Sequence, residues 1–158
     1  NQYYANGLLL AEESFNYIGL LPKGDPMMQI MAKENHGWKM TKDNGLAFQQ
    51  GSSYWWRLNP LVLILRLTVE NGAYNLTTLY NPRNLSPSIG SKLATGTVTV
   101  IINLGHDQYS VCGAGNTNGR AYINVYNRSS SSFVVAIGDD GSPNDHGADL
   151  MVYDYSKV

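Results

Sequence analysis

Short β-prone runs separated by turn signals constrain this chain more than any other feature of its sequence. Two of these runs flank Glu70-Asn71-Gly72, and Asn-Gly between apolar, β-branched runs is a strong hairpin signal. Asp43-Asn44-Gly45 predicts a second hairpin in the same way. Alternating or apolar runs predict further strands at residues 97–103, 120–127, 131–138 and 149–155.

Segment 24–37 leaves two interpretations open. Asp25 and Pro26 suit the first turn of a short helix, whereas Met28 and Ile30 alternate as they would in a strand. Turn-forming residues separate the other runs at short intervals. We therefore expect an all-β fold, a β-sandwich or jelly roll of about 7–9 antiparallel strands. One short N-terminal helix is the alternative that this segment leaves open.

Composition predicts a folded domain with a weakly charged surface. The chain has 158 residues, which predicts a single domain over residues 1–158. Charged residues make up 15% of it, against about 25% in a typical soluble domain, and the net charge is −1. Without a basic stripe, the electrostatic signature of nucleic-acid binding is missing. Low charge and many Ser, Thr, Asn and Tyr residues favour an extracellular or cell-surface location.

The sequence also argues against several kinds of site. The longest apolar run, Leu61–Val69, is interrupted by Arg66 and is far shorter than the roughly 20 residues of a membrane helix, so we predict no membrane span. Cys112 is the only cysteine, which excludes an intrachain disulfide and a cysteine-based zinc site. No motif pairs a nucleophile with a base. We therefore predict a binding or structural protein without catalytic residues.

An excess of acid lies between the last two predicted strands. Its carboxylates are those of Asp139, Asp140, Asp145 and Asp149. Carboxylates held close together repel one another, and a cation stabilises a tight loop that holds several of them. Ca²⁺ takes carboxylate, amide, hydroxyl and carbonyl oxygens, which Asn144 and Ser142 would supplement. The alternative is a long turn whose Asp, Asn, Gly, Ser and Pro residues serve turn geometry.

The stretch "FVVAIGDDGSPNDHGADLMVYDY" (residues 133–155) resembles the C-terminal calcium loop of small bacterial fucose- and mannose-binding lectins. In that family an acidic loop joins two apolar strands. Asp139-Asp140-Gly141-Ser142 matches the opening Glu-Asp-Gly-Thr of the family's loop, and Asn144-Asp145 matches its central Asn-Asp. Calcium-dependent carbohydrate-binding modules of plant-wall enzymes are similar in this region. Both likenesses imply a β-sandwich that binds sugar through calcium.

The loop departs from the lectin pattern at three places. Pro143 stands where the family has a ligand aspartate, Gly147-Ala148 replaces Asn-Asp, and Asp149 falls one position late. One calcium ion is therefore expected rather than two. The expected ligands are Asp139, Asp140, Asn144 and Asp145, which match the family's loop, together with Asp149. A sugar would bind the calcium through vicinal hydroxyls, with His146 and Ser142 as further contacts.

Trp55 and Trp56 provide a second candidate surface. Adjacent residues on a strand face opposite sides, so at least one of the two indoles is exposed or at an edge. An exposed indole stacks on a sugar ring or anchors a protein interface. The leading hypothesis is a non-enzymatic, calcium-dependent lectin or adhesin domain that binds a glycan. The alternative is a structural or assembly β-sandwich that uses aromatic residues for protein–protein contact, without metal. Both hypotheses leave a homo-oligomer open.

Overall fold

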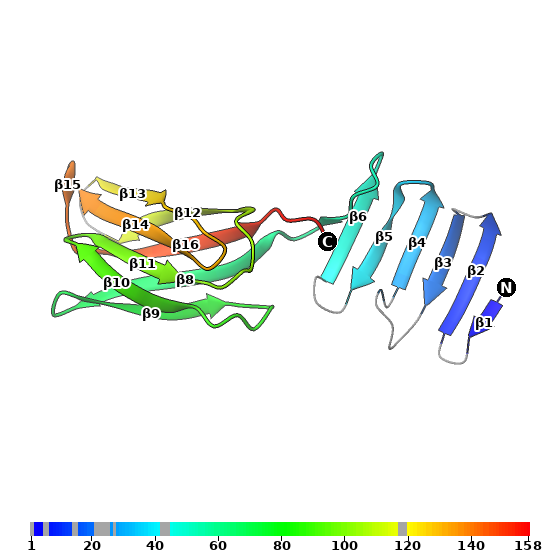
Figure 1. The fold of residues 1–158 in the computed structure, drawn as a ribbon, viewed down its shortest axis with the longest axis horizontal. Helices are drawn as coiled ribbons and strands as arrows, with labels where there is room; N and C mark the ends of the chain where they lie inside the picture. The colour runs from blue at the N-terminus through cyan, green and yellow to red at the C-terminus, as the bar shows by residue number, and fades with distance from the viewer. Residues whose placement is uncertain are drawn as a thin grey trace. The chain divides into compact units, whose positions relative to one another are not determined.

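The computed structural model describes residues 2–4, 7–13, 16–20, 26, 28–41, 45–116 and 120–158, with side chains from residue 18 onward. Every regular element among them is a β-strand, and the strands form antiparallel sheets (Figure 1), which confirms the all-β prediction. The described residues contain no helix that could cross a membrane. We predicted one domain, and the residues group into two compact units, Asn1–Pro60 with Tyr155–Val158 and Leu61–Asp154.

The unit formed by Leu61–Asp154 has the two sheets of a β-sandwich. One sheet has the order β10-β11-β14-β13, with β15 paired to β14, and the other has the order β12-β16-β8-β9. The strands are β8 (Leu61–Glu70), β9 (Ala73–Tyr80), β10 (Ser88–Ala94), β11 (Thr97–Ile101), β12 (Tyr109–Asn116), β13 (Ala121–Tyr126), β14 (Ser132–Asp139), β15 (Ser142–Pro143) and β16 (Gly147–Asp154). This unit alone therefore accounts for the predicted range of strands.

The core of this unit lies between the inward faces of its two sheets. Along β16, half-buried and fully buried residues alternate at every step, because successive side chains of a strand point to opposite faces. Leu150 and Val152 of β16 are fully buried in the same cluster as Val100 of β11 and Phe133 of β14. The period-two pattern of the sequence is thus the direct cause of the sandwich.

Both predicted hairpins are present. Strands β8 and β9 pair as far as Glu70 opposite Ala73. Between them, Asn71 and Gly72 have φ values of 51° and 75°, and a type I′ turn requires positive φ at both of its central residues. Strands β5 (His36–Thr41) and β6 (Gly45–Gln50) pair in the same way around the second signal. Asp43 and Asn44 of that signal lie outside the described residues.

The first unit contains a single antiparallel sheet whose strands follow one another in chain order. They are β1 (Gln2–Tyr4), β2 (Gly7–Glu13), β3 (Asn16–Leu20), β4 (Met28–Lys33), β5, β6 and β7 (Trp56–Arg57). The helix alternative for segment 24–37 is wrong, since Met28–Lys33 forms β4 between β3 and β5. Met28, Ile30 and Ala32 recur at every second position, so a strand places these three on one face. Asp25, the proposed helix cap, lies outside the described residues.

Candidate functional site

The predicted acidic loop begins with a tight turn. Strand β14 ends at Asp139, and Ser142 pairs back to it. Between them, Asp140 and Gly141 have φ values of 46° and 84°, a conformation for which Asp-Gly is a favoured pair. The Arg120 N–H donates to Asp140 Oδ1 at 3.4 Å. Asp140 therefore serves the turn, and Ser142 is exposed in the short strand β15.

Asp139 contacts two other residues of the predicted site. Its Oδ1 accepts a hydrogen bond from Asn144 Nδ2 at 3.3 Å. Its Oδ2 lies 2.9 Å from His146 Nε2, and both side chains of that pair are about a quarter exposed. Asp139, Asn144 and His146 are therefore the part of the predicted site that comes together.

Asp145 is held by different contacts. Lys92 Nζ lies 2.5 Å from its Oδ2, and the Gly96 N–H donates to its Oδ1 at 2.8 Å. The hydrogen bond from Lys92, followed by that from Gly96, lowers the pKa of Asp145 below its ordinary value. These two bonds tie the loop to β10 and to the β10–β11 turn rather than to the other carboxylates.

Asp149 lies on β16 and pairs with Arg66 of β8. The register places the two residues directly opposite each other, and two parallel bonds join them, Nε to Oδ1 at 2.7 Å and a terminal guanidinium nitrogen to Oδ2 at 2.9 Å. The bond from Arg66 lowers the pKa of Asp149. Both side chains are about half exposed, so solvent screening keeps the contribution of this pair to stability small.

The five expected calcium ligands thus do not form one set. Asp139 and Asn144 lie together and Asp140 serves the turn, whereas Asp145 and Asp149 are each held by a different cation. Within the described ranges, no three His, Cys, Asp or Glu side chains gather as a metal site would require. As they stand, these residues do not fit a five-ligand calcium site. The cationic side chains of Lys92 and Arg66 would first have to be displaced from Asp145 and Asp149. Calcium binding at this loop stays a prediction.

The contacts of Asp145 lead to a pH-dependent stability. Because its pKa is lower in the folded chain than in the unfolded chain, its contribution is complete above about pH 4 and is lost as the pH falls through the folded value. Asp145→Asn is expected to lower the free energy of unfolding by about 0.5–1.5 kcal/mol at pH 7 and to flatten the loss below pH 4. Urea unfolding between pH 3 and 7 measures this. Asp107→Asn, at an exposed position, is the matched control and should change the free energy of unfolding at pH 7 by no more than about 0.5 kcal/mol.

The tandem tryptophans contact different faces of the first unit's sheet, with Trp56 in β7 and Trp55 just before it. Lys39 Nζ lies 4.6 Å from the centroid of the half-buried Trp55 ring. Trp56 is directly opposite Phe48 in the sheet and is 38% exposed. Residues directly opposite each other in a sheet share a face, so Trp56 belongs to the face of Phe48.

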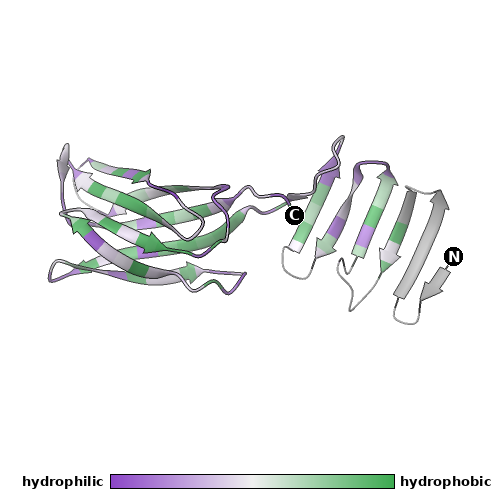
Figure 2. Cartoon of the chain, in the orientation of Figure 1, coloured by the Kyte–Doolittle hydropathy of each residue, from purple (hydrophilic) through white to green (hydrophobic). Residues whose placement is uncertain are grey.

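That face is a continuous apolar surface. The register of β3 to β7 aligns one row made of Ile18, Ile30, Trp38, Phe48 and Trp56 and a second row made of Leu20, Met28, Met40 and Leu46. We call these side chains the apolar face. None of them is fully buried, and Trp38 at the centre is 45% exposed. Figure 2 shows the hydrophobic positions recurring along β4, β5 and β6.

The opposite face carries the charges and is covered by the chain itself. Lys39, Ala47 and Arg57 form one of its rows. Trp55 lies against Lys39, and an Arg57 nitrogen donates to Ser156 Oγ at 2.9 Å. Ala47, between the two charged residues, has no exposed surface. Among the described residues, segments of the first unit therefore cover the row of Lys39, Ala47 and Arg57, whereas the side chains of the apolar face stay partly or largely exposed.

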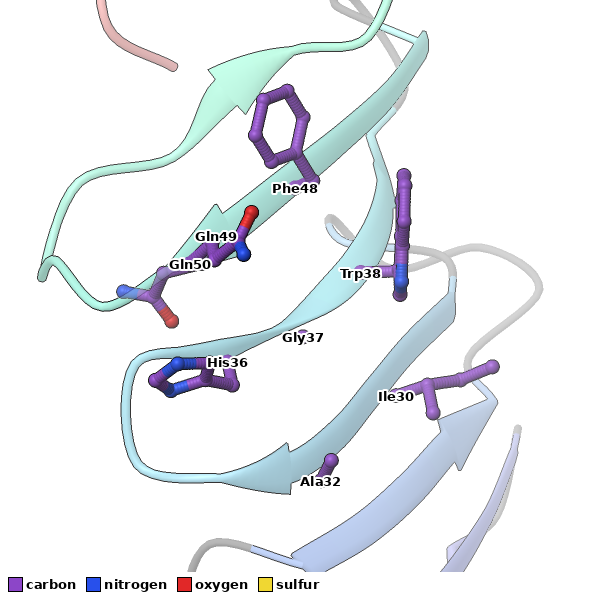
Figure 3. Close-up of a pocket in the computed structure, with 8 residues that line it drawn as sticks. All are labelled: Ile30, Ala32, His36, Gly37, Trp38, Phe48, Gln49 and Gln50. Carbon is purple, nitrogen blue, oxygen red and sulfur yellow. The ribbon is translucent and has the colours of Figure 1, made fainter.

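The apolar face is hollowed beside Trp38 (Figure 3). The rings of Trp38 and Phe48 lie 5.8 Å apart at 44° at one end of the hollow, and His36 and Gln50 lie at its polar end. The hollow has a volume of about 250 Å³ and is lined by Ile30, Ala32, His36, Gly37, Trp38, Phe48, Gln49 and Gln50. An apolar wall with a few polar groups at one end is a suitable recess for an aromatic side chain.

No protein-family model matches the sequence. Searches of curated proteins found no similar protein, and searches of solved structures found no similar fold.

Proposed function

We propose that this chain is a structural, non-enzymatic assembly protein that binds protein through the apolar face of its first unit. The observation that carries this proposal is the pair of registered rows across β3–β7, in which no charged side chain occurs. The core of protein interfaces is depleted in charge and enriched in Trp, Phe and Met. All three residue types are present in these rows.

The energetics of the sheet support the same proposal. A sheet is stable when its hydrophobic face is buried against another layer, and a contiguous exposed apolar patch marks an interaction site. Burial stabilises by roughly 25 cal/mol per Å² of apolar surface. Trp38, Ile30 and Met40 each keep more than a third of their surface exposed. Burial of this exposed apolar surface would therefore stabilise the sheet. A protein partner that covers it would supply that stabilisation.

The proposal requires the apolar face to be exposed to solvent in a variant that cannot bind a protein partner. Met40→Glu places a charge in this face and keeps Trp38, so the variant should be unassembled. The chain has three tryptophans, and the contribution of Trp38 is isolated by comparing Met40→Glu with Met40→Glu/Trp38→Phe. We expect acrylamide to quench Trp38 readily. Quenching of Trp38 no stronger than that of a buried indole would show that the chain itself covers the face, and the proposed function would be wrong.

A second candidate is calcium-dependent carbohydrate binding at the acidic loop, on an extracellular or cell-surface protein. The contact of Asp139 with Asn144 supports it, because it brings two of the implied ligands together. A thermal melt in EDTA and then in excess Ca²⁺ tests it, since a ligand at about 100 times its Kd stabilises by about 2.7 kcal/mol. A calcium-dependent rise in Tm together with glycan-array binding that EDTA abolishes would favour this candidate. An unchanged Tm would count against it.

A further inference from the structure

We propose that the partner of the apolar face is a second copy of this chain, with the two sheets packed face to face. This inference rests on the proposed function, which requires only that some protein covers the face. It adds the identity of that protein and the manner in which the two surfaces fit. Three features of the face favour self-association over a foreign partner: its charge, its area and its shape.

The charge pattern permits one copy to lie on another. The two rows from Ile18 to Trp56 and from Leu20 to Leu46 contain no Asp, Glu, Lys or Arg, so stacking the face on itself brings no like charges together. Proteins that avoid self-association commonly place a charge on such a surface. Of the charged residues on β3–β7, Lys39 and Arg57 lie on the opposite face, and Lys33 ends β4 opposite His36, outside the two rows. The two rows thus lack the device that would keep two copies apart, and they offer a charged partner nothing to pair with.

The size of the face is that of a small self-association interface. Neighbouring strands are about 4.8 Å apart and residues about 3.4 Å apart along a strand. The apolar face spans the five strands β3 to β7, so it is about 24 Å wide, and a typical strand of five or six residues is about 18 Å long. The planar area is therefore about 430 Å², and the accessible area of a ridged surface is larger. Interfaces at the small end of the observed range bury under about 600 Å² on each partner, which one copy of this face suffices to supply.

The shape of the face is suited to binding itself. Trp38 stands out from the centre, and the hollow beside it is lined by Ile30, Ala32 and His36. In a two-fold symmetric interface, residue i of the first copy contacts residue j of the second, and residue j of the first copy contacts residue i of the second. The protruding Trp38 and the recess for an aromatic ring are both present on every copy. Two indoles therefore enter two hollows, one in each direction.

Sedimentation velocity of the full chain over about 1–100 µM tests this inference. The wild type is expected to sediment as a homo-oligomer. Ile30→Glu places a carboxylate in the apolar face of each copy, and since burying an unpaired charge costs several kcal/mol, the dissociation constant should rise by at least about 100-fold. Gln29→Glu is the matched control. It adds the same charge one residue away on the opposite face, directly across from Lys39, and should leave the oligomer intact.

The outcomes separate this inference from the proposed function. A wild type that stays monomeric throughout, while Trp38 is open to acrylamide, overturns self-association and leaves docking to a foreign protein. An oligomer that Gln29→Glu and Ile30→Glu affect equally also overturns the inference, because assembly would then use another surface. If Ile30→Glu fails to fold, Met40→Glu replaces it in the same comparison. Circular dichroism of each variant shows which case applies.

Discussion

Phe133→Ala is expected to lower the free energy of unfolding of the Leu61–Asp154 unit by about 3–5 kcal/mol. Phe133 has no exposed surface and lies in the core cluster of that unit. Its ring is 6.4 Å from that of Tyr109 at an interplanar angle of 56°. Truncation removes the buried ring, the contact with Tyr109 and the close packing around both, and a rigid two-sheet core collapses only partly into the space.

Amide hydrogen exchange along β14 measures this loss separately from the other unit. All three tryptophans are at positions 38, 55 and 56, so their fluorescence reports the first unit and should be unchanged. Leu93→Ala removes an apolar side chain that is 56% exposed on β10. That control is expected to change stability by no more than about 0.5 kcal/mol. Equal effects of Phe133→Ala and Leu93→Ala would contradict the placement of the core.

Gly96→Ala is expected to destabilise the same unit by about 2–5 kcal/mol. Gly96 has a φ of +70° in the β10–β11 turn, where an L-residue is strained. A Cβ at this position would lie 2.2 Å from the Ile137 carbonyl oxygen and 2.8 Å from that of Asn144. These are backbone atoms, so they move only if the β11–β14 pairing and the acidic loop move with them. The bond from the Gly96 N–H to Asp145 is lost in the same displacement.

Gly72→Ala isolates the clash from the backbone strain. Gly72 has a φ of +75° in the β8–β9 turn, with open space where a Cβ would lie. Gly72→Ala should therefore lower the free energy of unfolding by only about 1–2 kcal/mol, which is the cost of placing an L-residue in the left-handed conformation. Urea unfolding of the two variants gives the difference directly. If Gly72→Ala were the more destabilising of the two, the packing of the acidic loop against the β10–β11 turn would be wrong.

The parts of the fold that the sequence predicts are those fixed by local chemistry. Asn71-Gly72 specifies its turn because both residues adopt positive φ with little strain. The alternation of the β13 run puts Ile123 and Val125 on one face, since side-chain direction in a strand depends only on position along it, and both pack against the core. Such features need no knowledge of distant residues.

The helix alternative was wrong because the Asp-Pro pair that precedes many helices also occurs in turns that precede strands. Pairing with β3 and β5 makes this segment a strand, because Ile30 pairs with Ile18 on one side and with Trp38 on the other. Tertiary pairing therefore overrides local propensity in this segment.

The candidate site was harder to predict because its contacts are distant in sequence. The partners of Asp145 and Asp149, Lys92 and Arg66, are 53 and 83 residues away. Composition therefore revealed an excess of aspartate residues but not the lysine and arginine side chains that pair with them. The apolar face was missed for the same reason, since its rows exist only once the register of β3–β7 is known. The detectable signal was the repeated alternation of large apolar residues through Met28–Met40 and Leu46–Phe48.

The most direct test of assembly through the apolar face is a cross-link between two chains. A photoreactive phenylalanine analogue at position 48 lies beside Trp38 in the sheet. After an equal mixture of ¹⁴N- and ¹⁵N-labelled chains is illuminated, mass spectrometry distinguishes links between chains from links within one chain. We predict mixed-isotope products that join position 48 of one copy to the β4–β5 segment of another. Products confined to single chains, at concentrations up to about 100 µM, would contradict the account.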